Sequence, residues 1–148
     1  MKKRLLLLAV FTLASCAFAQ SSQKISDILA SDEITKGEAA YFACVNKNLT
    51  DESATEDEAF AFLAGQNLFG EDESAEEKIS VEKACFLIAR TENMKGGVFY
   101  SIMKNPRYAL REFKALGIVP SNADPKRKIS GEEFIALFNG FAEKGKIK

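Results

Sequence analysis

Few side chains in this sequence could carry covalent or acid–base chemistry. The 148-residue chain contains three cysteines and no histidine. That composition excludes Ser/His/Asp triads, Cys/His nucleophiles, and zinc or haem sites held through histidine. Neither Cys44 nor Cys85 has a nearby pattern of cations that would lower its thiol pKa. We therefore expect a protein that is not an enzyme, with no catalytic residues and no cofactor.

Carboxylates alone could form a glycosidase-type pair, but they have simpler roles here. Glu82 and Glu132 lie in predicted first turns of helices, where a negative charge stabilises the amino-terminal end. Residues 122–133 match several ligand positions of an EF-hand loop, yet Lys126 and Arg127 replace a ligand and the turn glycine. We expect neither a hydrolase nor a metal site.

The two cysteines of the predicted mature chain leave two interpretations open. Cys44 and Cys85 each lie in an apolar stretch of helical character, over residues 39–45 and 84–88. In an oxidising compartment such a pair forms either a disulfide or two buried free thiols that pack as small hydrophobic residues. We favour the free thiols and keep the disulfide as the alternative.

The amino-terminal segment predicts export. Basic residues 2–4 precede an apolar run over residues 5–13 that is too short to span a bilayer. Cleavage before Gln20 fits the small residues that precede it, whereas residues 13–16 resemble a bacterial lipobox in which Cys16 is acylated. We expect a periplasmic or envelope protein that is attached to a membrane only if Cys16 carries a lipid.

Charge is unevenly distributed along the single domain, residues 20–148, that follows the export signal at 1–19. Residues 20–94 carry 6 basic and 16 acidic side chains, whereas residues 95–148 carry 11 basic and 5 acidic ones. These charges form either solvated faces or a basic end that binds anionic lipid headgroups, an acidic wall polymer or an acidic partner. The cations of that end are Lys104, Arg107, Arg111, Lys114, Lys126, Arg127 and Lys128. An exported, acidic chain is not expected to bind nucleic acid.

Local signals for helix ends recur along the chain, and no useful strand alternation appears. Asn105 precedes Pro106 as a helix start, and Gly117 follows as a helix end. Three capping boxes join a hydroxyl residue to the glutamate three positions later, in the pairs Thr35 with Glu38, Thr55 with Glu58, and Ser130 with Glu133. One apolar stripe consists of Phe134, Leu137, Phe138 and Phe141. The sequence predicts an all-α fold of six or seven short helices.

An internal repeat organises these helices. A shift of 50 residues aligns residues 59–88 with residues 109–138 and places Asn67 opposite Gly117. Both residue types tolerate the left-handed conformation that ends a helix. A shorter third copy contains Ile34, which matches Ile79 and Ile129. We expect two complete helix-turn-helix repeats and one truncated repeat, with serine N-caps at positions 80 and 130.

Residues 93–104 have no counterpart in the other copies and form an insertion. Gly96 and Gly97 break the preceding helix. The apolar residues that follow, Val98, Phe99, Ile102 and Met103, either close the core or form a partly exposed aromatic groove with Tyr100 and Tyr108. We favour closure of the core, because a small α domain needs its large apolar side chains inside.

Residues 109–119 and 124–134 resemble the S-layer homology repeat. A helix ends in Leu-Gly-Ile-Val, a proline stands four residues before Ile129-Ser130, and an acidic residue opens the next helix. The family's Gly-aromatic-x-Asp-Gly segment is missing. The resemblance implies a pseudo-threefold helical bundle that binds an acidic wall polymer or a peptidoglycan-linked sugar.

The family binds its polymer through a basic residue after Ile-Thr. This position is occupied by Lys36, Val81 and Gly131, so one copy keeps the cation. The resemblance implies that Lys36 contacts the ligand, and a positive field around it would come from Lys126, Arg127 and Lys128. We expect a non-enzymatic envelope module that binds a wall polymer. The alternative is a lipid-anchored accessory subunit whose partner is an envelope protein complex.

Overall fold

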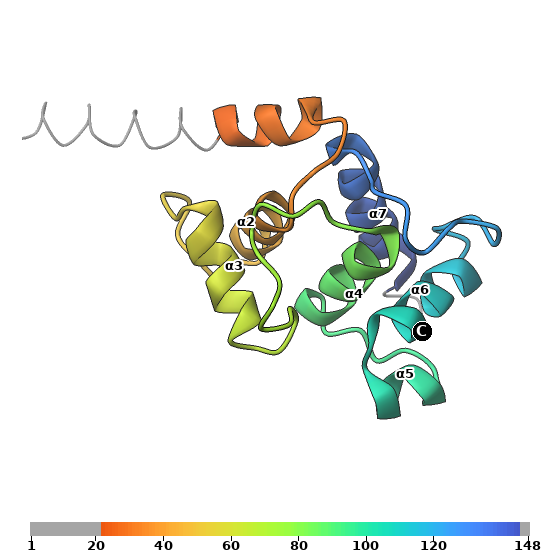
Figure 1. The fold of residues 1–148 in the computed structure, drawn as a ribbon. Helices are drawn as coiled ribbons and strands as arrows, with labels where there is room; N and C mark the ends of the chain where they lie inside the picture. The colour runs from red at the N-terminus through yellow and green to blue at the C-terminus, as the bar shows by residue number, and fades with distance from the viewer. Residues whose placement is uncertain (1–21, 146–148) are drawn as a thin grey trace, which may run out of the picture.

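The computed structural model describes residues 22–145 as an all-helical chain (Figure 1). A helix over residues 22–30 is followed by α2 (Lys36–Asn46), α3 (Glu56–Ala64), α4 (Val81–Thr91), α5 (Val98–Met103), α6 (Pro106–Ala115) and α7 (Gly131–Lys144). The predicted all-α class with six or seven helices is confirmed. The predicted export signal, its two cleavage sites and Cys16 lie outside the described residues. Within that described part, no helix is long and apolar enough to cross a membrane.

Local sequence accounts for several helix starts. Two predicted capping boxes form completely, at Thr35 with Glu38 and at Thr55 with Glu58. In the first, the Glu38 backbone N–H donates to the Thr35 hydroxyl at 3.0 Å, and the Glu38 carboxylate accepts from the Thr35 N–H at 2.6 Å. Asn105 caps α6 from its side chain, with proline at the first helical position. Backbone donors that the helix itself cannot satisfy thus find partners nearby.

Two other predicted caps differ from expectation. Ser130 accepts a hydrogen bond from the Glu133 backbone N–H at 3.1 Å, but the Glu133 carboxylate pairs with Arg127 and does not complete the box. Ser80 stands at the N-cap of α4 and makes no side-chain capping bond. At Ser80 the Glu82 N–H donates instead to the Pro125 carbonyl at 3.2 Å, and at Ser130 the Glu133 carboxylate is taken by Arg127, so contacts with residues 125–127 override the local signal.

Four helices end at a left-handed residue. The residues and their φ angles are Asn48 (54°), Asn67 (59°), Asn93 (52°) and Gly117 (67°). At the end of α6, Gly117 N–H donates to Lys114 at 3.0 Å and Ile118 N–H donates to Phe113 at 3.0 Å, which is the Schellman pattern. The predicted left-handed roles of Asn67 and Gly117 are therefore confirmed.

The hydrophobic core is built around α4. Eight of its eleven residues are buried, and α4 contacts α2, α6 and α7. The predicted stripe of α7 is buried as expected, and its Phe141 ring stacks on Phe113 at a centroid distance of 5.2 Å. Phe42 of α2 meets Phe138 edge-to-face at 5.4 Å. Aromatic contacts therefore tie the last helix to elements from both halves of the chain.

Three segments, residues 31–36, 77–81 and 127–131, meet at one place that we call the junction. Ile34, Ile79 and Ile129 are almost fully buried there. Ile34 N–H donates to the Ile129 carbonyl and Ile79 N–H donates to the Ile34 carbonyl, each at 3.0 Å. Further bonds run from Lys36 N–H to Glu77, from Val81 N–H to Arg127, and from Gly131 N–H to Ser31. The start of each of α2, α4 and α7 is thus bonded to the segment that precedes another of them.

Backbone packing at the junction requires glycine at one position. A Cβ atom on Gly131 would lie 1.6 Å from the Ile28 carbonyl oxygen and 2.6 Å from its carbon. Both atoms belong to the backbone of the 22–30 helix and cannot rotate away. The amino-terminal helix is therefore held against the start of α7 by close main-chain contact.

The favoured expectation that the insertion closes the core is wrong for most of its side chains. Within α5 only Tyr100 is buried. The exposed fractions are 72% for Val98, 58% for Phe99, 74% for Ile102 and 56% for Met103. These four residues share one face of the short helix, and Tyr100 points to the other. The exposed aromatic alternative holds in part, since Phe99 stacks on Tyr108 at 5.9 Å whereas Tyr100, its other expected member, is buried.

Candidate functional site

Lys36, the cation that the resemblance marks for ligand binding, lies at the junction and is 5% exposed. Its ammonium group pairs with Glu77 and stands 3.6 Å from Glu73 Oε2. The other oxygen of Glu73 accepts from Lys83 at 2.7 Å. The charge of Lys36 is therefore already balanced by two carboxylates. An anionic ligand would have to displace them.

The three cations at 126–128 lie at or beside the junction, and they too have internal partners. Lys126 Nζ is 2.6 Å from Glu82 Oε1, and Arg127 holds both oxygens of Glu133 at 2.5 and 2.8 Å. Lys128 donates to a backbone carbonyl at 2.8 Å. The structure thus brings these cations to the same part of the molecule as Lys36, where each already has a partner, although the Lys126 side chain is 81% exposed. Their role in ligand binding stays a prediction.

Ionisation at the junction reflects these pairings. The hydrogen bond from Lys36 holds the pKa of Glu77 below its usual value, with a further contribution from the charge of Lys128. Burial by itself would raise the pKa of Glu73, but the bond and charge of Lys83, with the charge of Lys36, outweigh it and lower that pKa. These carboxylates stay ionised near neutral pH, so the cations keep their partners.

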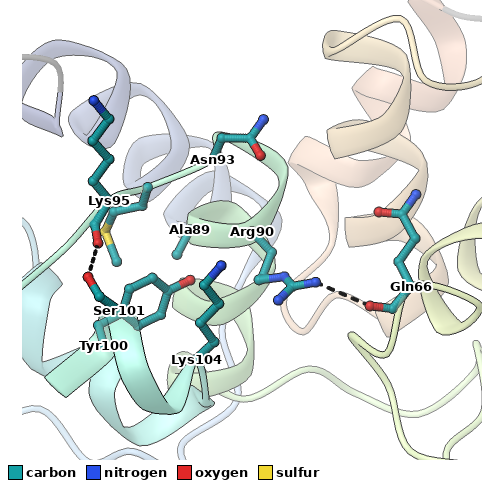
Figure 2. Close-up of a pocket in the computed structure, with 9 residues that line it drawn as sticks. Gln66, Ala89, Arg90, Asn93, Lys95, Tyr100, Ser101 and Lys104 are labelled. Carbon is teal, nitrogen blue, oxygen red and sulfur yellow. Dashed lines mark hydrogen bonds between the residues drawn. The ribbon is translucent and has the colours of Figure 1, made fainter. Parts of the chain in front are cut away.

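A second candidate site lies at the opposite end of α4, and sequence reasoning did not predict it (Figure 2). This cleft has a volume of about 460 Å³. It is lined by Gln66, Ala89, Arg90, Asn93, Met94, Lys95, Tyr100, Ser101 and Lys104. We call it the cationic cleft, because its lining holds three basic side chains and no carboxylate.

The three cations of the cleft are Arg90, Lys95 and Lys104. Within residues 22–145, none of them makes an ion pair. Arg90 donates to the Gln66 carbonyl at 3.3 Å and lies over the Phe86 ring at 6.0 Å, which fixes its direction. Unlike the cations at 126–128, these three keep their charge free for an anion.

Neutral hydrogen-bonding groups accompany the cations. Gln66 and Asn93 bring side-chain amides to the lining, and Ser101 and Tyr100 bring hydroxyl groups. Burial raises the pKa of Tyr100 to about 12, although the charge of Arg90 acts in the opposite direction. The phenol is therefore protonated near neutral pH. A lining that combines cations with amides and hydroxyls suits an anionic ligand with its own hydroxyl groups, such as an acidic sugar.

Local chain geometry shapes the cleft. Asn93 ends α4 in the left-handed conformation, and the Met94 N–H returns to the Ala89 carbonyl at 2.8 Å. Gly96 has φ 60°, and a Cβ there would lie 2.6 Å from Tyr100 Cδ1. The Ser101 hydroxyl donates to the Lys95 carbonyl at 2.7 Å, which fastens the loop to α5 (Figure 2). The insertion thus forms one wall of the cleft.

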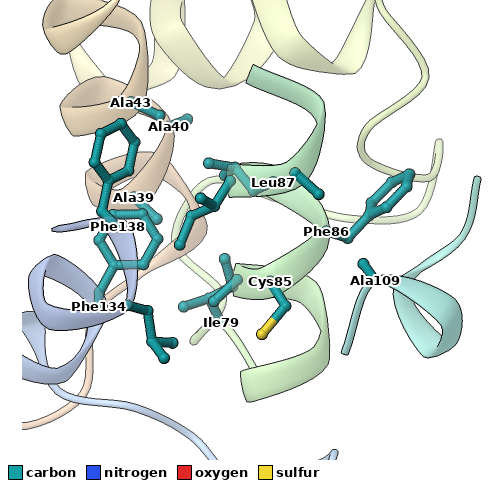
Figure 3. Close-up of a cluster of buried hydrophobic side chains, with 14 of the residues drawn as sticks. Ala39, Ala40, Ala43, Ile79, Cys85, Phe86, Leu87, Ala109, Phe134 and Phe138 are labelled. Carbon is teal, nitrogen blue, oxygen red and sulfur yellow. The ribbon is translucent and has the colours of Figure 1, made fainter. Parts of the chain in front are cut away.

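The cysteines lie apart from both sites. Cys44 and Cys85 are buried and free, so no bond corresponds to the disulfide that was the alternative interpretation. Figure 3 shows Cys85 within the apolar cluster that includes Ile79 and Leu87. Burial raises the pKa of Cys44 to about 11, and burial with the charge of Glu133 raises that of Cys85. Both thiols remain protonated, whereas the thiolate is the reactive form.

Potential metal ligands are also scattered. Within residues 22–145, no group of three or more cysteine, aspartate or glutamate side chains is placed to hold a metal ion. The EF-hand-like segment contributes no such cluster, and its Lys126 is paired with Glu82.

Comparison with models of known protein families found no match, and comparison with curated proteins found none either. The resemblance to S-layer homology repeats therefore stays a prediction that rests on the sequence motifs.

Proposed function

We propose that this protein is a non-enzymatic binding module of the cell envelope, and that it binds an acidic wall polymer in the cationic cleft. One observation carries the choice of site. Arg90, Lys95 and Lys104 all line one cavity and have no carboxylate partner in the described part of the chain. Because an unpaired cation gives up no existing ion pair when it binds, these side chains favour an anionic ligand more than Lys36 does.

The neutral groups in the cleft support a sugar polymer. Asn93, Gln66 and Ser101 are polar residues of the lining beside the cations, and Tyr100, also in the lining, is almost fully buried. An acidic wall polysaccharide carries several hydroxyl groups on each sugar unit in addition to its acid groups. The volume of about 460 Å³ is suited to one or two such units.

The test is retention on purified wall sacculi that still carry their acidic polymer. The double variant Arg90→Gln/Lys104→Gln removes two cations from the cleft, and we expect it to weaken retention about tenfold or more. The matched control, Lys126→Gln/Lys128→Gln, removes two cations outside the cleft and should retain most of the binding. Melting temperatures of all three proteins confirm that the variants are folded.

Salt dependence adds a second readout. Screening shortens from about 10 Å at 0.1 M salt to about 3 Å at 1 M, so retention of the wild type should fall steeply over that range. If the cleft variant and its control weakened retention equally, the polymer would be attracted by the overall positive charge of the protein and not by a specific site. Absence of wild-type retention at low salt would overturn the proposed function.

Lys36→Ala tests the position that the resemblance implies. Lys36 and the cationic cleft lie at opposite ends of α4. If the cleft holds the ligand, Lys36→Ala should leave retention nearly unchanged once the protein is shown to be folded. Loss of retention in a folded Lys36→Ala protein would place the polymer at the junction, as the family pattern implies.

The second candidate function is a lipid-anchored accessory subunit of an envelope protein complex. The exposed apolar face of α5 supports this candidate, because a sugar polymer would not cover it and a protein subunit could. The intact mass of the mature protein would decide whether Cys16 is acylated. A lipid on Cys16, together with no retention on sacculi, would favour this candidate.

A further inference from the structure

The most unusual surface of the molecule is the tip formed by α5 and its flanks, residues 95–111, which we call the α5 tip. In the described residues seven large hydrophobic side chains are exposed, and four of them belong to this six-residue helix. Those four are Val98, Phe99, Ile102 and Met103, each more than half exposed. Figure 1 shows α5 at the outer edge of the ribbon, beside α6. A concentrated apolar face of this kind marks an interaction surface.

The α5 tip is held in a defined conformation. Tyr100 is 1% exposed and anchors the helix from its inner side. The Phe99 ring stacks on Tyr108 with an interplanar angle of 10°, and the Arg111 guanidinium lies 5.5 Å from the centroid of the same ring. The apolar face is therefore presented outward by packing, and does not result from a helix that has failed to dock.

Four cations lie on the segments that flank this face, and one of them, Arg111, contacts it through the Phe99 ring. Lys95 and Lys104 flank α5 in the chain, and Arg107 and Arg111 lie one turn apart on α6. Residues 93–111 contain no aspartate or glutamate. Across residues 22–145, the ion pairs involve none of these four cations. The other basic residues predicted for this end, Lys114 and those at 126–128, have internal partners.

We infer that the α5 tip docks on the surface of a bilayer that contains anionic lipids. The apolar side chains enter the boundary between headgroups and acyl chains, and the four cations contact lipid phosphates around them. This arrangement matches the general design of interfacial membrane binding, in which an apolar face and basic residues act together.

A lipid surface fits better than a protein partner for two reasons. A stable protein interface takes about 20–30 residues on each side with an apolar centre, and only four large apolar side chains are exposed at the tip. The central part of a protein interface is also depleted in charge, whereas four cations of one sign match a surface of uniform negative charge. This inference shares Lys95 and Lys104 with the proposed polymer site, but the four exposed apolar side chains are not part of the cleft lining and can be changed separately.

The experiment is co-sedimentation with vesicles. Protein is made from Gln20, the predicted mature start, because the apolar run at 5–13 would itself bind lipid. The core from Ile28 to Phe141 lies wholly within that chain. One set of vesicles contains equal parts of phosphatidylglycerol and phosphatidylcholine, and a second set contains phosphatidylcholine alone. We expect the wild type to bind the first set and to bind the second much more weakly.

Paired variants distinguish binding through the α5 tip from non-specific adsorption of exposed apolar side chains. Ile102→Ser/Met103→Ser removes apolar side chains from the tip and should reduce partitioning at least about tenfold. The matched control Leu49→Ser/Phe62→Ser removes exposed apolar side chains elsewhere, which are 41% and 39% exposed, and should bind like the wild type. Arg107→Gln/Arg111→Gln should weaken binding to anionic vesicles and reduce its salt dependence.

Three results would overturn the inference. In the first, the wild type does not bind anionic vesicles; in the second, the tip variant and its control lose vesicle binding equally. In the third, the protein forms a dimer in solution that the tip variant abolishes, and it does not bind vesicles. The last result would identify a second copy of the chain as the occupant. Retention on sacculi is measured with the same proteins. If the tip variant Ile102→Ser/Met103→Ser loses vesicle binding and keeps sacculus binding, the two proposals succeed or fail separately. Because Lys104 belongs to both the cleft and the tip, the Arg90→Gln/Lys104→Gln variant is compared with the wild type on sacculi only.

Discussion

The junction and the α5 tip use similar residues in opposite ways. At the junction three isoleucines are buried, and Lys36 is enclosed by Glu73 and Glu77. At the tip, Ile102 and its apolar neighbours face solvent, and the cations around them have no carboxylate partner in the described part of the protein. At the junction, charged and apolar side chains find their partners within the protein. At the tip, the corresponding side chains remain available to a binding partner.

The difference lies in where the acidic residues fall. The acidic segment 71–77 folds against Lys36, and the first turns of α4 and α7 supply carboxylates to Lys126 and Arg127. No acidic residue occurs between 93 and 111, and the neighbouring Glu112, whose carboxylate lies beside Gly97, makes no ion pair within residues 22–145. A run of positive charge therefore indicates a binding surface only when the fold brings no acidic segment to it. This principle moves the candidate site from the 126–128 run to the cleft and the tip.

The largest expected effect is at the junction, where Gly131→Ala places a Cβ 1.6 Å from the Ile28 carbonyl oxygen. Because both atoms are fixed to backbone, we expect a loss of about 4 kcal/mol or more in the free energy of unfolding. Chemical denaturation measures it. Gly70→Ala serves as control, since its nearest contact would be 3.8 Å from a flexible glutamate side chain. Similar stabilities of the two variants would contradict the close main-chain contact.

Tyr100→Ala tests whether the α5 tip has a single buried anchor. Removing this fully enclosed ring should reduce the free energy of unfolding by about 3 kcal/mol. Ile102→Ala, on the same helix but 74% exposed, should change it by less than about 0.5 kcal/mol. If Ile102→Ala proved as costly as Tyr100→Ala, the outward face would be packed in solution and the contrast with the junction would disappear.

Gly117→Val tests the carboxy-terminal end of α6, the helix against which α5 packs. A Cβ there meets nothing within 4 Å, so the cost comes from the φ of 67° alone. We expect a loss of about 1–2 kcal/mol in thermal or chemical unfolding. Gly117→Asn should lose less, since asparagine occupies the equivalent ends at positions 48, 67 and 93. An unchanged melting temperature in Gly117→Val would refute the helix-end assignment.

The smallest expected effect is a dependence of the junction on pH. The Lys36 hydrogen bond lowers the pKa of Glu77 below its ordinary value of 4.5. A carboxyl group with a lowered pKa in the folded state stabilises the protein above the unfolded value, and this contribution is lost as pH falls through the folded pKa. The melting temperature should therefore fall as pH is lowered from about 5 to about 3.

Two variants isolate that dependence. Glu77→Gln cannot titrate, so its melting temperature should fall less over the same pH range. Glu143→Gln changes an exposed carboxyl on α7 that makes no ion pair within residues 22–145, and it should follow the wild type. Identical profiles for all three proteins would show that the junction pairs contribute nothing to stability.

Local signals predicted the all-α class and much of the boundary structure. The Thr35 and Thr55 capping boxes, the Asn105 cap and the left-handed end at Gly117 were all readable from sequence. Each depends on atoms within about five residues of one another, so the residues themselves fix the geometry. The buried stripe of α7 was also predictable, because its spacing places it on one face.

Only the tertiary structure decided which charges and apolar side chains are available. Lys36 pairs with Glu77 across 41 residues, and Lys126 pairs with Glu82 across 44. The cleft likewise needs Gln66, Arg90 and Lys104 from separate elements. The sequence by itself determined the helical class and the caps at Thr35, Thr55 and Asn105, because those interactions are local. Pairing of distant charges and exposure of α5 depend on which segments meet in space, and local spacing does not contain that information.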